Sequence, residues 1–240
     1  MIPAVSVAQM REVDRLMVEQ VGIDLFQMME NAGRALAEHT RQLLGGDVQG
    51  RRVLVLAGRG GNGGGGLTAA RRLALWNAEV TVLLGQGKHE IGGVPARQLA
   101  IVERIGLPIF EPASSPPAFA QADVLIDALI GYSLSGPPRE PIAGLIRKAN
   151  ASGVPIVALD IPSGLHGDSG DAFDPTIRAT TTLTLALPKA GLLQPAARAW
   201  VGSLYLADIS VPEAVYRQLG LNVGPIFSRS DIVPIGSGAG

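Results

Sequence analysis

Polar side chains stand where several apolar runs of this sequence end, and each run reads as a buried strand. They are Asn62, Asp127, Asp160, Ser163 and Lys189. The carboxyl ends of parallel strands meet at one edge of a sheet, where ligands bind. A carboxylate buried there needs a hydrogen-bonding partner or a cation. We therefore expect these side chains to form one site, although either aspartate alone could instead cap the turn that follows it.

The candidate ligand atoms are all oxygens. Asn62, Asp127 and Ser163 suit a hard cation and exclude the soft-ligand sites of zinc or iron. Cysteine is absent, so the chain has neither disulfides nor thiolate chemistry. Ser163 lies in Pro-Ser-Gly rather than in a Gly-x-Ser-x-Gly elbow, which leaves a serine-hydrolase triad unsupported. The histidines are expected at the surface or in loops: His39, His89 and His166.

A glycine-rich stretch, RRVLVLAGRGGNGGGGL, spans residues 51–67. Its apolar start predicts a strand, its glycines predict a loop, and the amphipathic run 67–76 predicts a helix. Backbone N–H groups at such a helix start bind phosphates. Gly66 is not followed by Lys-Ser or Lys-Thr, which excludes a Walker A loop, and no acid ends the next strand, 79–84, to hold a ribose. A tight turn without a ligand is the alternative.

Strand and helix patterns alternate along most of the chain. Two helices come first, each with a capping-box pattern, Ser6 with Gln9 and Asp24 with Gln27. This order predicts an α/β fold, a three-layer αβα Rossmann-like domain with a mostly parallel central sheet. The first two helices must pack onto the outside of that sheet or onto a partner. We expect one domain over 1–225 and a flexible tail over 226–240. Strands are expected near 53–56, 80–84, 107–110, 124–129, 155–159, 181–187 and 204–209, and later helices near 95–105, 142–151 and 212–219.

The composition is that of a globular protein. The chain has 240 residues, of which 47% are hydrophobic and 31 are glycine. Lys and Arg total 20 against 21 Asp and Glu, for a net charge of -1. This balance argues against a nucleic acid or a membrane surface as partner. No apolar run is long enough for a membrane span, and the N-terminus does not read as a signal peptide. We expect a soluble, cytoplasmic protein.

Five segments, in this order, resemble the N-terminal domain family of the YjeF type, the NAD(P)H-hydrate epimerases. The resemblance covers nearly the whole chain, and the combination is highly specific. It implies a homodimeric isomerase that interconverts the R and S forms of hydrated NADH and NADPH in nicotinamide nucleotide repair. It also implies a potassium ion and, as a functional partner, NAD(P)H-hydrate dehydratase. The segments are MREVDRLMVEQVGIDLFQMMENAG, GRGGNGGGGLTAARRL, DVLIDALIGYSLSGPPREP, VPIVALDIPSGLHGDSG and TLTLALPKAGL.

The resemblance also implies roles for individual residues. Asn62, Asp127 and Ser163 match the potassium ligands. We take Asp160 as the catalytic acid and base, and Lys189 as a residue that either holds a phosphate or steadies developing negative charge. The nucleotide contacts implied are Gly61, Asn62, Gly63, Gly64, Gly65, Gly131, Tyr132, Ser133, Leu134, Ser135, Gly136, Pro137 and Asp160.

One departure from the family pattern matters. The family loop reads G-x-G-N-N-G-G-D-G-L, whereas this chain has Gly61 for the first Asn and Gly65 for the Asp. A catalytically impaired nucleotide-binding or scaffolding module of the same fold is therefore the alternative function. An ordinary NAD(P)-dependent oxidoreductase is disfavoured, because the ribose acid and a Tyr-x-x-x-Lys or His-based catalytic set are missing.

Overall fold

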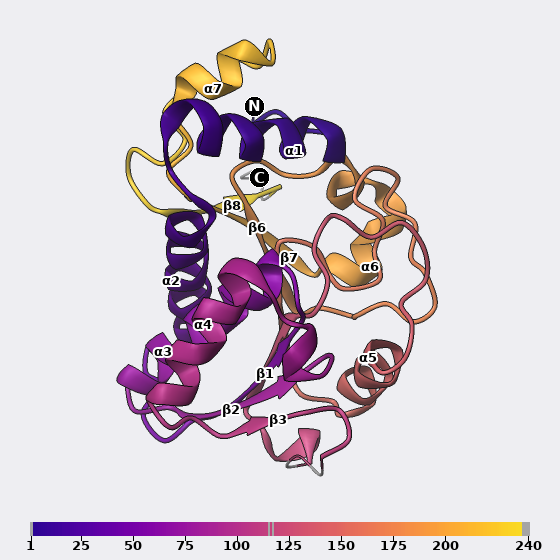
Figure 1. Cartoon of the computed structure of the whole chain (residues 1–240). Helices are drawn as coiled ribbons and strands as arrows, with labels where there is room; N and C mark the ends of the chain where they lie inside the picture. Colours follow the sequence, from indigo (N-terminus) through magenta and orange to yellow (C-terminus); the bar gives the residue numbers. More distant parts are fainter. Residues whose placement is uncertain (1, 115, 117, 237–240) are drawn as a thin grey trace.

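The computed structural model describes residues 2–114, 116 and 118–236 (Figure 1). Its centre is an eight-stranded sheet in the order β3-β2-β1-β4-β5-β6-β7-β8. Neighbouring strands are parallel except β7 and β8, which are antiparallel. The chain moves outward from β1 to β3 and then returns to β4, so the strand order reverses between β1 and β4. The strands are β1 (Arg52–Ala57), β2 (Glu79–Leu84), β3 (Ile109–Phe110), β4 (Val124–Ala128), β5 (Ile156–Leu159), β6 (Thr181–Leu185), β7 (Ser203–Ala207) and β8 (Ile232–Ile235).

Helices cover both faces of the sheet, which confirms the predicted three-layer α/β fold. In Figure 1, α2, α3 and α4 lie on one side of the strands and α5 and α6 on the other. One apolar core lies under the first group and another under α5. The α-helices are α1 (Val7–Leu16), α2 (Leu25–Leu43), α3 (Gly61–Leu75), α4 (Gly93–Arg104), α5 (Ile142–Ala151), α6 (Arg198–Val201) and α7 (Glu213–Gln218). Short turns of 3-10 helix lie at Lys88–Glu90, Phe119–Gln121, Ala190–Leu193 and Pro195–Ala197. None of the described helices is long and apolar enough to cross a membrane.

The two predicted capping boxes are present. Ser6 and Gln9 bond each other's backbone at the start of α1, and Asp24 and Gln27 do the same at the start of α2. A π-helical turn, Met17–Val21, follows α1 and ends at Gly22. The helix α2 packs on α3, whereas α1 lies beside α7 at the top of Figure 1 and packs with it in a separate apolar cluster. Both N-terminal helices therefore pack within this chain.

The glycine run differs from its prediction. We expected a loop up to Gly66, but α3 already begins at Gly61. Glycine disfavours a helix interior by roughly 1 kcal/mol per residue relative to alanine. Close packing offsets this cost, because a Cβ at Gly63 would lie 1.7 Å from the Gly58 carbonyl oxygen and one at Gly64 would lie 2.5 Å from Met29 Sδ. The first turns of α3 approach their neighbours more closely than any residue with a side chain could.

Two further expectations are corrected. The tail beyond residue 226 is not all flexible, because β8 pairs with β7 at the edge of the sheet, where Pro234 is tolerated. Residues 237–240 lie outside the described part of the chain. His39 is not at the surface: the residue is 5% exposed, its Nε2 lies 2.9 Å from Thr181 Oγ1, and its ring packs against the Tyr205 ring in a tilted arrangement. The helical stripe that carries His39 faces the sheet, and neither partner is close to it in sequence.

Candidate active site

A large cleft opens where the strand order reverses, at the carboxyl ends of β1, β4 and β5. Its volume is about 1190 Å³, larger than the range of roughly 300–1,000 Å³ for small-molecule pockets. The start of α3 and the loop after β4 both line it. The predicted residues that line it are Gly61, Asn62, Gly131, Tyr132, Ser133, Leu134, Ser135, Gly136, Pro137, Asp160 and Lys189. The cleft therefore has the size and the backbone groups that a dinucleotide needs.

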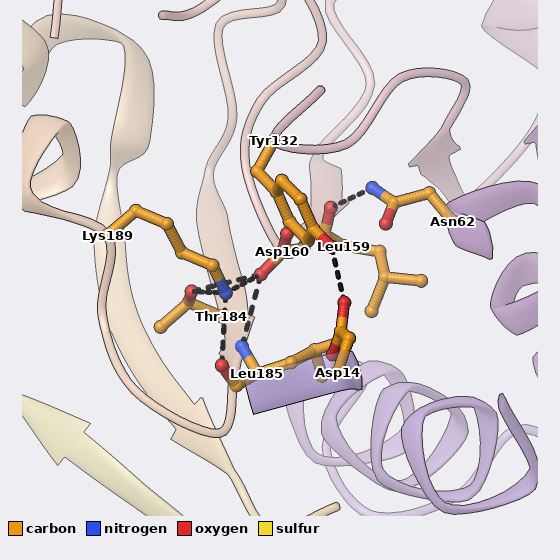
Figure 2. Close-up of polar contacts among 8 residues, drawn as sticks. All are labelled: Asp14, Asn62, Tyr132, Leu159, Asp160, Thr184, Leu185 and Lys189. Atoms are coloured by element: carbon orange, nitrogen blue, oxygen red, sulfur yellow. Dashed lines mark hydrogen bonds and ion pairs between the residues drawn. The ribbon is translucent and has the colours of Figure 1, made fainter. Parts of the chain in front are cut away.

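Asp160 and Lys189 form a buried ion pair in the floor of this cleft. Their side chains are almost completely buried, and the Lys189 ammonium donates to Asp160 Oδ1 (Figure 2). It also donates to the Leu185 carbonyl oxygen at 3.0 Å. Asp160 Oδ1 further accepts from the Leu185 N–H and from Thr184 Oγ1, each at 3.3 Å. Lys189 thus borders the cleft, but its ammonium is engaged by the Asp160 carboxylate and the Leu185 carbonyl.

The second carboxylate oxygen of Asp160 is placed differently. Oδ2 accepts no hydrogen bond from the residues that the structure describes, and it is not fully enclosed by protein atoms. Asp160 itself lines the cleft. Its backbone has φ of 66°, a left-handed conformation that is uncommon outside glycine and often marks functional sites. The strand end therefore turns one oxygen toward Lys189 and leaves the other available to a ligand.

Asn62, Asp127 and Ser163 meet at the single turn that follows β4. Asp127 Oδ1 accepts from the N–H of the first turn residue, Leu129, at 3.3 Å. Ser163 Oγ accepts from the N–H of the second, Ile130, at 2.9 Å. Asn62 Oδ1 lies beside the third, 2.7 Å from where a Cβ on residue 131 would be. The structure thus brings together the three residues predicted as cation ligands.

Asp127 is completely buried among neutral partners. It accepts hydrogen bonds from the Ser163 backbone N–H at 2.8 Å and from the Ser163 hydroxyl at 2.6 Å. Burial raises the pKa of Asp127 to about 6, and the hydrogen bonds from Ser163 and Leu129 counteract this rise. Among the described residues, no Lys, Arg or His forms an ion pair with it. Asn62 directs its amide nitrogen to the Leu159 carbonyl, at 2.8 Å, and its Oδ1 bonds no described donor. This set of oxygens fits a hard cation.

The remaining glycines of the predicted nucleotide loop do not line the cleft. Gly63, Gly64 and Gly65 are buried inside the packing of α3. A Cβ at Gly65 would lie 2.8 Å from Leu159 Cδ2. The departure from the family Asp at this position therefore coincides with a leucine that fills the adjacent space.

Sequence reasoning missed Asp14. It lies on α1 and lines the cleft, and its Oδ2 accepts a hydrogen bond from the Tyr132 hydroxyl (Figure 2). A signal was present, because Asp14 falls between Met10 and Met17 at helical spacing and so interrupts the buried stripe with a charge. Three arginines that also line the cleft were not singled out either: Arg11, Arg59 and Arg139.

Comparison with known proteins agrees with this geometry. The sequence pattern of the family described as YjeF-related protein N-terminus matches residues 25–191. The chain belongs to this family. It is 49% identical to an NAD(P)H-hydrate epimerase of Dehalogenimonas lykanthroporepellens over 92% of this chain and 87% of that protein. It is 36% identical to an NAD(P)H-hydrate epimerase of Rhodopirellula baltica over 92% of this chain and 89% of that protein.

Longer and structurally characterised relatives are also found. A bifunctional NAD(P)H-hydrate repair enzyme Nnr of Moorella thermoacetica is 35% identical over 87% of this chain, which matches 41% of that protein. The crystal structure of the yeast protein ynu0, YNL200c, superimposes with a TM-score of 0.83 at 25% identity. That match covers 97% of this chain and 100% of the yeast chain. The whole fold, rather than the sheet alone, is shared with this yeast protein.

Proposed function

We propose that this chain interconverts the R and S forms of hydrated NADH and NADPH, as a potassium-dependent epimerase in nicotinamide nucleotide repair. The observation that carries the proposal is the buried pair of Asp160 and Lys189 in the floor of a dinucleotide-sized cleft. The names of its relatives support the substrate. The buried pair and the names of the relatives together favour an enzyme over an impaired binding module. A module that only binds nucleotide has no need of a buried ion pair at the reacting end of the cleft.

The chemistry requires one proton donor and acceptor. The substrate carries a hydroxyl on C6 of its reduced nicotinamide ring, next to the ring nitrogen N1. When the hydroxyl is protonated, the N1 lone pair forms a C=N bond and the C6–O bond breaks, which releases water. Water then adds to the other face of C6 and returns its proton. Asp160 Oδ2 is the group that gives and takes this proton, a contribution of roughly 10²–10⁴-fold in rate.

Lys189 supports this role from the other carboxylate oxygen of Asp160, Oδ1. Its ammonium is held by Asp160 Oδ1 and the Leu185 carbonyl, so it keeps Asp160 oriented and compensates its charge when the proton has left. Of the two roles considered for Lys189, binding a phosphate is disfavoured by this enclosed position. The phosphates of the substrate are expected at the start of α3, where backbone N–H groups and Arg59 line the cleft.

The potassium site of this proposal comprises Asn62, Asp127 and Ser163. A cation there would compensate the buried Asp127 charge and would hold the turn 129–131, from which the cleft loop 131–137 continues. That turn also borders Asn62, which bonds the Leu159 carbonyl just before Asp160. The homodimer, the cytoplasmic location and the functional link to NAD(P)H-hydrate dehydratase stay predictions from the family resemblance.

The test is epimerisation of purified R-hydrate of NADPH, followed as loss of the R isomer against the spontaneous background. We expect fast turnover in potassium chloride, a lower rate in sodium chloride at equal ionic strength, and background rates for Asp160→Asn. An Asp127→Asn variant should lose the difference between the two salts. Background rates for the wild-type protein, with the hydrate still bound, would instead establish the impaired nucleotide-binding module.

A further inference from the structure

Tyr132 connects the N-terminal helix to the catalytic pair. Its hydroxyl donates a hydrogen bond to Asp14 Oδ2 on α1 (Figure 2). The face of its ring lies toward the Lys189 ammonium, with Nζ 5.8 Å from the ring centroid, within the range of a cation–π contact. Tyr132 therefore touches α1 with one end and faces the Asp160–Lys189 pair with its ring.

Tyr132 is also the second residue of the cleft loop 131–137. Among the described hydrogen bonds, residues 131–138 make one to another element of the fold, and that is the bond from the Tyr132 hydroxyl to Asp14. The turn just before the loop is fastened by Ser163, and the residue just after residue 138 accepts a backbone bond at the start of α5. Between these two points, polar attachment of the loop to the rest of the protein depends on Asp14.

The charges around Asp14 fit a fixed acceptor rather than a solvated surface acid. Burial raises the pKa of Asp14, while the hydrogen bond from Tyr132 and the charge of Lys189 oppose the rise and Asp160 adds to it. Burial and the Asp14 charge raise the pKa of Tyr132 far above its ordinary range. The hydroxyl therefore stays protonated and acts as a donor, not as a base.

We propose that Asp14 is a positioning residue, which holds the cleft loop 131–137 and the Tyr132 ring in place for the nucleotide through its hydrogen bond to Tyr132. The inference rests on the proposed epimerase site and adds to it a residue on a helix that precedes the sheet. A preformed loop lowers the conformational cost of binding. Loss of the bond should therefore weaken substrate binding more than it slows the chemical step.

The test compares four variants with wild type: Tyr132→Phe, Asp14→Ala, the double variant, and Asp14→Asn. The first removes the hydroxyl and keeps the ring beside Lys189, and Asp14→Asn keeps an acceptor oxygen without the charge. Glu12→Gln is the matched control, because Glu12 lies on the same helix and pairs with Arg15 away from the cleft. The measurements are kcat and KM for the R-hydrate, the Kd of unhydrated NADPH, and amide hydrogen exchange of residues 131–137.

A hydrogen bond to a charged acceptor corresponds to an effect of about ten- to hundredfold. We expect Tyr132→Phe and Asp14→Ala each to raise KM and the NADPH Kd by this factor, with a smaller change in kcat and faster exchange confined to the loop. The double variant should match either single variant, because the two residues act as one unit. Asp14→Asn should recover part of the affinity, and Glu12→Gln should match wild type.

Wild-type affinity and loop exchange in Tyr132→Phe and Asp14→Ala would overturn the inference, as would effects that simply multiply in the double variant. Failure of the proposed function is distinguishable from this result. An inactive wild-type protein would overturn the epimerase, while the NADPH Kd and the exchange of the loop would still decide the role of Asp14. Exchange elsewhere in the chain reports whether each variant is folded.

Discussion

The pair of Asp160 and Lys189 allows a sharp separation of stability from catalysis. Both side chains are buried, at 3% exposure for Asp160 and 1% for Lys189, so a single substitution leaves one charge enclosed without its partner. Removal of one member of a buried ion pair costs about 3–5 kcal/mol because the other charge stays buried without a partner, whereas replacement of both members by well-packed apolar residues of similar volume is often neutral. We therefore expect Asp160→Asn and Lys189→Met each to lose about 3–5 kcal/mol in the free energy of unfolding, and the double variant to recover most of it.

Urea unfolding followed by circular dichroism measures these free energies, and R-hydrate turnover measures activity in the same preparations. The control is an exposed pair of similar geometry, Lys88 and Glu103, with 2.8 Å between Nζ and Oε1 and side chains 40% and 42% exposed. Glu103→Gln and Lys88→Met should each change the free energy of unfolding by less than about 1 kcal/mol. Because catalysis needs the Asp160 carboxylate, the stable double variant should remain inactive.

Two results would refute this reasoning. Single variants of Asp160 and Lys189 that unfold like the Glu103 control would show that the pair is not enclosed as described. A double variant that turns over the hydrate at the wild-type rate would show that neither residue handles the proton.

Three further predictions concern other parts of the fold. Burial lowers the pKa of His39 from 6.5 to about 4, so the unfolded chain takes up this proton first as the pH falls. The stability that neutral His39 contributes is fully present above pH 6.5 and is lost as the pH falls toward 4. When the pH is lowered from about 7.5 to 5.5, the free energy of unfolding, measured in urea, should therefore fall by about 1.3 kcal/mol less in His39→Gln than in wild type. Gly63→Ala, whose Cβ would lie 1.7 Å from a backbone oxygen, should cost about 3 kcal/mol or more. Gly60→Ala, with open space around its Cβ, should change the midpoint of thermal unfolding little. Gly65→Asp should destabilise the protein through the clash with Leu159. The double variant Gly65→Asp with Leu159→Ala should lose about 0.5–3 kcal/mol less in the free energy of unfolding than the sum of the two single changes. An additive result would contradict the packing described here.

Much of the architecture could be predicted from local sequence patterns. The capping boxes at Ser6 and Asp24 were predicted because their partners lie three residues away. The helix of residues 142–151 and the alternation of buried strands with amphipathic helices follow from periodicity, which is also local. Because the strands are parallel, that alternation brings the residues at their carboxyl ends to one edge. The sequence by itself therefore determined the fold class and the edge of the sheet that carries the site.

Tertiary structure decided which of those residues meet. Asp127 bonds Ser163 across 36 positions, and Tyr132 bonds Asp14 across 118; no spacing rule reaches that far. The helical conformation of the glycine run also depends on neighbours, since local propensity opposes it and only the close approach of α3 to residues such as Met29 explains it. Local propensities are set by each residue and its immediate neighbours along the chain, whereas pairing and burial depend on segments that become neighbours only when the chain folds.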